Sequence, residues 1–433
     1  MQKSESKIQK RSRWSWYFYD FGNSAYASVI LLAVYSTFFK NVVVGGAEGI
    51  RLWGISVGSA AVLVALVSPV LGTIADFTKF KKKFLMIFTG LSIVFTALLF
   101  FVGKGDVFLG MLFFILSEIG YRAAQVFYDA LLSDVSTPET IGSISGKGWA
   151  MGMVGGILSL LIVLVPIQLI GDHMIPYAFL ITAVFYFISS IPTLLWVKET
   201  RAAEVIPQEE TALTLAFKKI ATTFRYIKNY KEFIKYTVAF LLYNDGIMML
   251  MDFAAIIGAT LYGLDQVQLI MFVVIIQFAG AIGALLFGKL ADKKSNKEAT
   301  LVALVMLIVS VAALFFISSL TEFFIVGFFA GFSLSGAQAV SRSMVVLLAP
   351  QESITEFYGF LSVAGRTSTF VGPLVFGTLT FRMNNWYVNH GVNALQAEQY
   401  GLMWGIGSII LFLVVGSVLL LLVKRVSLAK QEQ

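Results

Sequence analysis

The stretch Gly72-Thr-Ile-Ala-Asp76, which is followed at once by a run of lysines, decides how this chain is organised. A second copy, Gly288-Lys-Leu-Ala-Asp292, stands 216 residues later (288 − 72) and is also followed by lysines. Each copy comes directly after a long apolar run. A turn motif that recurs in register indicates two copies of one structural unit.

The composition excludes a water-soluble protein. The 433 residues are 58% hydrophobic and 13% charged, with a mean hydropathy of +0.83. Soluble chains carry about 25% charged residues. The absence of Cys excludes disulfides, thiolate metal sites and a cysteine nucleophile, and two His make a histidine metal centre improbable. No phosphate-binding glycine loop and no catalytic triad is present, so we expect neither an enzyme nor a cofactor.

Twelve apolar runs predict an all-α membrane protein with twelve transmembrane helices, since about 20 residues cross a bilayer. The runs are 14–40, 53–75, 84–103, 107–133, 145–171, 176–197, 233–262, 267–288, 299–319, 323–348, 356–381 and 401–423. We expect a tail (1–13), a six-helix bundle (14–197), a linker (198–232), a second six-helix bundle (233–423) and a second tail (424–433).

The basic residues predict the orientation in the membrane. Of the 32 Lys and Arg, 24 fall in segments on one side, four on the other and four within or beside spans. Positive residues favour the cytoplasmic side, so both termini are expected there. This asymmetry accounts for the net charge of +7 without a nucleic-acid partner. The N-terminal apolar run is too long for a cleaved signal.

The linker contains an amphipathic pattern. Its apolar residues recur every three or four positions, at Leu213, Phe217, Ile220, Phe224 and Ile227. Basic residues occupy the rest of the helical wheel. This pattern predicts a helix lying at the membrane surface, in contact with lipids.

The fourth span carries a polar stripe. Glu118, Arg122, Gln125 and Asp129 follow one another at steps of four, three and four, and therefore share one helix face. A lone charge in the membrane costs about 2.5–3.5 kcal/mol on insertion scales, so this face should point to the protein interior. Glu118 and Arg122 can pair with each other. Two interpretations stay open: a structural ion pair, or a pair that also handles substrate or a proton.

The first span of each half carries carboxylates. Asp20 and Asn23 share a face of the first span with Ser24, and Tyr26 lies one turn further on. The seventh span carries Tyr243, Asn244, Asp245 and Asp252. Buried carboxylates are suited to binding a proton or cation. We therefore predict Asp20, Glu118, Asp245 and Asp252 as ion-coupling residues; the alternative for Asp20 is an interfacial helix-start residue.

Spans ten and eleven supply the remaining candidates. The internal repeat aligns Gln125 with Gln338, 213 residues apart (338 − 125), and the same shift places Asp129 opposite Arg342. We predict that Asp129 and Arg342 pair as a cytoplasmic gate, with Asp76 and Asp292 of the repeated turns as further gating residues. Arg366, in span eleven, could bind a carboxylate or phosphate.

Glycines crowd the fifth span, at Gly148, Gly152, Gly155 and Gly156. Small residues let the backbones of membrane helices approach closely, so close helix packing is the expected role of these glycines. Direct contact with substrate is the less favoured interpretation.

Three stretches resemble one family. They are Tyr19-Asp-Phe-Gly-Asn-Ser-Ala-Tyr26, the segment from Phe127-Tyr-Asp129 to Gly155-Gly156, and the segment from Gln338 through Ser341-Arg342 to Gly372-Pro373. Together with the two six-helix repeats, they resemble the vacuolar-effluxer-like branch of the major facilitator superfamily. That branch comprises autophagy-linked amino-acid effluxers of fungi and bacterial relatives. This chain departs from it in having Phe21-Gly22 for Trp-Ala and Asp129 for Asn.

The resemblance implies a secondary transporter that works by alternating access. We expect substrate to contact Asn23, Tyr26, Arg122, Gln125, Tyr128, Tyr243, Asn244, Gln338 and Arg366. The leading substrates are hydrophobic amino acids or short peptides, exported with proton coupling, or with sodium as the alternative. Two other functions stay open: transport of an amphiphile such as a lysolipid or glycolipid, and a non-transporting sensor or scaffold. The expected setting is a monomer in a bacterial plasma membrane.

Reversing the charge of Asp129 or Arg342 alone should abolish activity, and exchanging the two charges should restore it, because an ion pair requires only opposite signs. Transport by the Asp129→Arg, Arg342→Asp and double variants provides the measurement. A double variant as inactive as the single ones would contradict the pairing.

Overall fold

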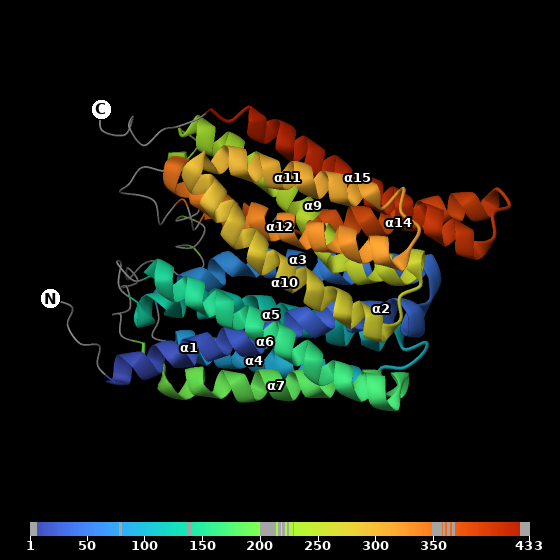
Figure 1. Cartoon of the computed structure of the whole chain (residues 1–433). Coiled ribbons are helices and arrows are strands. Elements are labelled where there is room, and N and C mark those ends of the chain that lie inside the picture. Colours follow the sequence, from blue (N-terminus) through green and yellow to red (C-terminus); the bar gives the residue numbers. More distant parts are fainter. Residues whose placement is uncertain are drawn as a thin grey trace. The chain divides into compact units, whose positions relative to one another are not determined.

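The computed structural model describes residues 7–77, 80–136, 141–199, 229–348 and 369–424. It also describes isolated positions between them: 214, 218, 221–222, 225–227, 357, 360–361 and 364–365. The described chain is helical, and no strand occurs in these residues. It divides into two compact units (Figure 1).

The first unit comprises Met1–Val44 and Leu63–Lys218. Its helices are α1 (Lys7–Ala25), the π-helix η1 (Tyr26–Ala33), α2 (Tyr35–Phe38), the π-helix η2 (Phe39–Val44), α4 (Lys81–Leu98), the 3-10 turn η3 (Leu99–Phe101), α5 (Val107–Val135), α6 (Ile141–Ile170), the 3-10 turn η4 (Asp172–Met174) and α7 (Ile175–Trp196). Helix α1 packs against α6 and α7, and α4 packs against α5.

The second unit comprises Gly45–Val62 and Lys219–Gln433. Its helices are α9 (Lys231–Tyr262), α10 (Gln266–Lys293), α11 (Asn296–Ala313), α12 (Leu320–Leu348), α14 (Val371–Asn389) and α15 (Ala394–Leu421). Helix α3 (Gly46–Phe77) begins in this unit and ends in the first. The first helix of each unit packs against the last, α1 on α7 and α9 on α15, as expected for a repeat.

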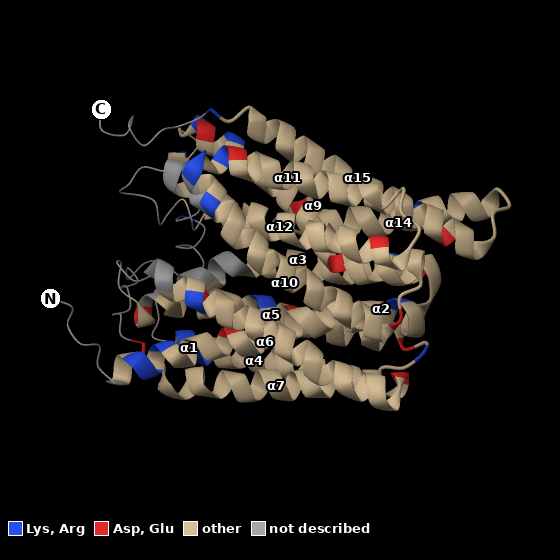
Figure 2. Ribbon diagram, in the orientation of Figure 1, with Lys and Arg blue, Asp and Glu red and all other residues tan. Residues whose placement is uncertain are grey.

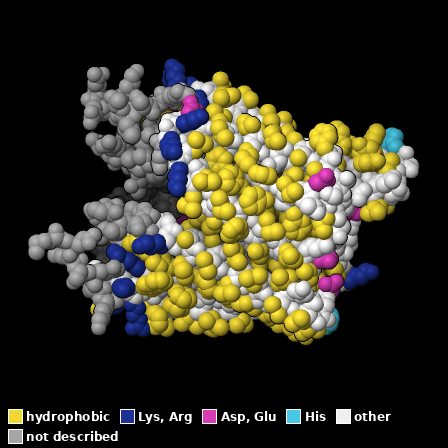
Figure 3. Space-filling view, in the orientation of Figure 1, with side chains coloured by type: hydrophobic (Ala, Val, Ile, Leu, Met, Phe, Trp, Pro, Cys, Tyr) yellow, Lys and Arg dark blue, Asp and Glu magenta, His cyan; other side chains and the backbone are white. Residues whose placement is uncertain are grey.

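Eleven helices within the described residues are long and apolar enough to cross a membrane. They correspond to eleven of the twelve predicted spans, and α14 covers the later part of the remaining one. Charged residues gather mainly at the helix ends (Figure 2). Between these ends the surfaces seen in Figure 3 are covered by hydrophobic side chains, as lipid contact requires. The protein is therefore an all-α integral membrane protein.

Glycines of α6 bring its backbone against α1. A Cβ atom on Gly155 would lie 2.0 Å from the carbonyl oxygen of Phe21, and one on Gly148 would lie 2.4 Å from the ring of Trp16. The second unit shows the same close packing at a glycine, because a Cβ on Gly283 of α10 would lie 1.9 Å from the carbonyl oxygen of Phe332 on α12. The predicted packing role of the span-five glycines is confirmed at these positions.

Local signals set several helix boundaries. Gly263, at φ 67°, ends α9 in the left-handed conformation that glycine tolerates. Asp265 begins α10 with a capping box shared with Gln268. The repeated motifs place Asp76 and Asp292 in the last turns of α3 and α10, but their side chains lie outside the described part. Most of the predicted linker helix also lies outside it.

Replacing Gly155 by Ala should lower stability by about 1–3 kcal/mol, because the added methyl group overlaps the backbone of Phe21. Gly407→Ala in α15 is the matched control, since a Cβ there would meet no atom within 4 Å. The midpoint of thermal unfolding in detergent measures both. Equal midpoints for the two variants would contradict the close α1–α6 approach.

Candidate functional site

The helix of the first span changes its winding at Tyr26. Helix α1 ends at Ala25 and continues as the π-helix η1, a form that is frequent at functional sites. Asn23 and Tyr26 flank this change, and both are buried. The Tyr26 hydroxyl and the Ser117 hydroxyl of α5 lie 2.9 Å apart in a hydrogen bond. The Nδ2 atom of Asn23 has no hydrogen-bond partner among the described residues.

A charged pair lies on α5 beside Tyr26. Glu118 is fully buried, and its Oε1 atom pairs with Nε of Arg122 one turn later. The Arg122 side chain stays 23% exposed. The other carboxylate oxygen, Oε2 of Glu118, is buried and has no hydrogen-bond partner in the described part of the chain. The rings of Tyr26 and Tyr121 stack at 4.7 Å next to the pair. The site therefore presents a cation, an unfilled carboxylate oxygen and an aromatic surface together.

An aromatic cluster follows on the same faces of α1 and α5. The ring of Tyr128 stacks on Trp16 at 4.4 Å and on Tyr19 at 4.9 Å. The Tyr19 hydroxyl bonds to Thr89 at 2.6 Å and to Tyr186 at 2.8 Å. These contacts fix the orientation of Tyr128, which the sequence assigned to substrate contact.

Other predicted residues of the first unit surround this cluster. Asp20 is half-buried, and Gly152 of α6 makes room for it, because a Cβ there would lie 3.2 Å from Cγ of Asp20. Gln125 is half-buried, whereas Asp129 is exposed. The polar stripe therefore changes along α5 from a buried pair at Glu118 to an accessible carboxylate at Asp129.

The second unit has a comparable arrangement on α9. The Tyr243 hydroxyl lies 2.7 Å from Oγ of Ser341 on α12, and the Tyr236 hydroxyl donates to the carbonyl oxygen of Ser341 at 2.5 Å. In the first unit, Trp16 donates to the carbonyl oxygen of Tyr128 at 3.1 Å. Ser341 and Tyr128 are 213 residues apart (341 − 128), the offset that relates Gln338 to Gln125.

The predicted carboxylates of α9 are buried. Asp245 is 3% exposed and Asp252 is 7% exposed, with Asn244 beside them at 7%. The Oδ1 atom of Asp245 has no hydrogen-bond partner among the described residues. The main-chain carbonyl of Asp252 accepts a hydrogen bond of 2.9 Å from the Trp53 indole of α3.

Several predicted residues cannot be placed in either cluster. Gln338 of α12 is half-buried. Arg366 and the side chain of Arg342 lie outside the described residues, so the Asp129–Arg342 gate stays a prediction. Among the described residues, no group of three His, Cys, Asp or Glu could hold a metal ion.

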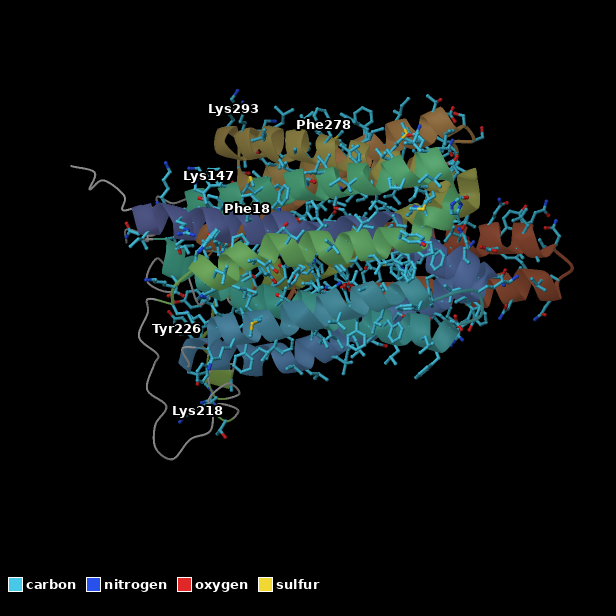
Figure 4. All side chains as sticks on the ribbon, turned by 90° about the horizontal axis from the view of Figure 1, so that it is seen from below. Phe18, Lys147, Lys218, Tyr226, Phe278 and Lys293 are labelled. Carbon is cyan, nitrogen blue, oxygen red and sulfur yellow. The ribbon has the colours of Figure 1, made fainter. Side chains whose placement is uncertain are left out.

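Sequence reasoning missed the serines and tyrosines that hold the candidate residues in place. Ser117 adjoins Glu118 in sequence, but its bond to Tyr26 joins residues 91 positions apart. The partners Thr89 and Tyr186 of Tyr19 come from α4 and α7. The signal that could have indicated these residues is the occurrence of Ser, Thr and Tyr within otherwise apolar spans. Figure 4 shows the described side chains crowding the spaces between the helices; the labelled Phe18 lies on α1 and Phe278 on α10.

Comparison with known proteins identifies the family. A model of the family described as "Vacuole effluxer Atg22 like" matches residues 52–141 and 133–395. The chain belongs to this family. It is 28% identical over 373 residues to an uncharacterized MFS-type transporter, YxiO, of Bacillus subtilis, covering 83% of this chain and 86% of that one. It is 23% identical over 271 residues to autophagy-related protein 22 of Yarrowia lipolytica, covering 56% of this chain and 46% of the fungal protein.

Solved structures show the same fold. A bacterial homologue of the human lysosomal transporter Spinster, inward-facing and occupied, matches with a TM-score of 0.72 and 14% identity, over 98% of this chain and 97% of that chain. The nucleoside transporter NupG matches with a TM-score of 0.72 and 15% identity, over 95% of this Atg22-like chain and 100% of NupG. These structures show that the fold is of the major facilitator type, and membership of the vacuole effluxer family makes the chain a membrane transporter rather than an enzyme.

Replacing Arg122 by Gln should destabilise this Atg22-like protein by about 3–5 kcal/mol, because Glu118 would remain buried without its cation. The double variant Glu118→Gln/Arg122→Gln removes both charges and should recover most of the loss. Thermal unfolding of the three variants in detergent tests this. A double variant less stable than Arg122→Gln would show that the pair itself supplies the stability.

Proposed function

We propose that this transporter exports small zwitterionic solutes, with hydrophobic amino acids or short peptides as the leading class, by alternating access coupled to protons. The observation that carries the proposal is the Glu118–Arg122 pair, which offers both charges that an amino acid needs. Arg122 can donate to a carboxylate through its guanidinium fork. The unfilled Oε2 of Glu118 can accept from an ammonium group.

The surroundings of the pair support this substrate class. The Nδ2 of Asn23, which has no partner among the described residues, is a second donor suited to a carboxylate. The stacked rings of Tyr26 and Tyr121 offer an apolar surface for an aliphatic or aromatic side chain. Glu118 has no access to water, so an unpaired ammonium group would gain strongly from reaching it.

Two buried carboxyl groups support the proton coupling and the outward direction of transport that we propose. The buried carboxylates of Glu118 and Asp245 each keep one oxygen without a hydrogen-bond partner among the described residues, which suits a group that takes up a proton. A proton entering from outside would then drive the solute out. Following the basic residues, we place both termini in the cytoplasm and the protein in a bacterial plasma membrane.

Proteoliposomes preloaded with radiolabelled leucine should release it faster when the external buffer is made acidic. Arg122→Gln should weaken apparent affinity by about 10- to 100-fold, since it removes charged hydrogen bonds worth about 1.5–3 kcal/mol. Lys10→Gln, which removes an exposed cation of α1, is the matched control and should not change release.

Two results would contradict the proposal. Flux of a lysolipid without flux of leucine or dipeptides would assign an amphiphile as the substrate. Leucine release that changes neither with the pH gradient nor with the Arg122→Gln substitution would contradict both the proposed binding site and the proposed proton coupling.

A further inference from the structure

One face of α1 changes from basic to apolar over two turns. Arg11, Trp14 and Phe18 follow one another at steps of three and four, so they share that face. All three side chains are exposed, and that of Trp14 is 50% exposed. Seven residues of helix rise about 10 Å, which is enough to cross the headgroup layer of one leaflet, about 5–8 Å thick. A face graded in this way fits the boundary of a bilayer.

Helix α7 has a lipid-facing row of side chains that ends beside this face. Ile188 and Leu195 are exposed and seven positions apart, so they lie on one side of the helix. Trp196 ends the row and is 40% exposed. Helix α7 packs along α1, and the Thr193 hydroxyl donates to the carbonyl oxygen of Ser15. The lipid-facing sides of the two helices are therefore held together at this end of the first unit.

Arg11 joins the two helices through an aromatic contact. Its guanidinium carbon lies 3.7 Å from the centre of the Trp196 ring. Stacking on an indole holds the flat guanidinium in place and leaves the N–H groups at its edge for another partner. No carboxylate of the described residues forms an ion pair with Arg11. The edge of this guanidinium can therefore bind a phosphate through two parallel hydrogen bonds.

The charged side chains next to Arg11 along both helices are basic. Lys10 precedes it on α1, and Lys198 follows Trp196 at the end of α7; both are exposed. No Asp or Glu occurs in residues 7–18. Figure 3 shows Lys and Arg side chains gathered at the left edge of the hydrophobic surface. This end of the first unit therefore attracts anions.

Two carboxylates near the cytoplasmic ends of α5 and α7 already have partners. Glu199, which follows α7, accepts from the backbone N–H groups of Lys81 and Lys82 at 3.3 and 3.0 Å. Asp134 of α5 pairs with Lys81 at 3.1 Å. These carboxylates are thus engaged and not available to the ammonium group of a zwitterionic lipid. The surface favours a lipid whose phosphate carries an uncompensated negative charge.

We propose that Arg11, Trp14 and Trp196 form a binding site for an anionic phospholipid. The lipid phosphate binds the guanidinium of Arg11, and the acyl chains lie along the exposed apolar faces of α1 and α7. The two indoles suit the level of the headgroups, since each has an apolar ring and a polar N–H group. Such a lipid links the first helix of the unit to the last. The site lies on the lipid-facing surface, so it does not depend on the proposed solute or on proton coupling.

Titration of the purified protein with lipid in a neutral detergent tests the site. The probe is dioleoyl phosphatidylglycerol, and the reference is phosphatidylcholine with the same acyl chains. The midpoint of thermal unfolding is measured at each lipid concentration, because a ligand of the folded state raises it. Phosphatidylglycerol should raise the midpoint along a saturating curve, at a concentration about tenfold lower than phosphatidylcholine requires.

Two substitutions distinguish a defined site from general attraction to a basic surface. Arg11→Lys keeps the charge but loses the flat group that stacks, and Trp196→Leu removes the ring without changing any charge. Each should raise the phosphatidylglycerol concentration at half effect about fivefold, as expected for the loss of an exposed cation–π contact. The matched controls are Lys10→Arg in the same turn of α1 and Trp404→Leu in α15, where the indole is 49% exposed. Neither control should change the response.

Three results would overturn the proposal: equal responses to the two lipids, an unchanged response in Arg11→Lys and Trp196→Leu, or equal weakening in these variants and their controls. Where a substitution alters the midpoint without lipid, native mass spectrometry supplies the same comparison by counting the bound lipids. No solute is present in these measurements. Failure of the leucine assay would therefore leave the lipid site standing, and absence of the lipid response would leave the proposed transport standing.

Discussion

The cost of an unpaired charge in a medium of low dielectric constant governs this molecule. In a chain with only 13% charged residues, every ionised group within a span must find a partner or give up its charge. Glu118 meets this requirement through Arg122, whereas Oδ1 of the buried Asp245 has no hydrogen-bond partner in the described part of the chain. Oε2 of Glu118 is likewise buried without a hydrogen-bond partner among the described residues. The two carboxyl groups are therefore the places where the proposed proton and the cationic group of the proposed substrate would bind.

Close backbone packing is the second constraint, and it explains how small changes can be transmitted. Gly155 against Phe21, Gly283 against Phe332 and Gly54 against Pro373 leave no room for a single methyl group. Interfaces of this kind hold one arrangement or separate, because they cannot deform gradually. Helices packed in this way can move as rigid bodies. A transporter that alternates between two states needs this property.

Much of the fold and part of the site were predictable from periodicity. Eleven of the predicted spans appear as long apolar helices, and the steps between Glu118 and Arg122 placed them one turn apart, where they pair. The internal offset related Gln125 to Gln338, and the same offset relates the two main-chain carbonyls that accept from Trp16 and Tyr236. The change of α1 into a π-helix at Tyr26 was not predictable, because a π-turn has no distinct apolar period.

The sequence by itself determined the membrane setting, the two-fold repeat and which faces carry charge, since these follow from hydropathy and from helical spacing. It also showed that Asp245 would be buried. Only the tertiary structure decided what each buried group contacts: the Tyr26 hydroxyl bonds to Ser117, and the Trp53 indole donates to the main-chain carbonyl of Asp252. Such partners come from other helices, up to 199 positions away in the sequence. Periodicity along one helix carries no information about which neighbour faces it, because helix packing alone sets that choice.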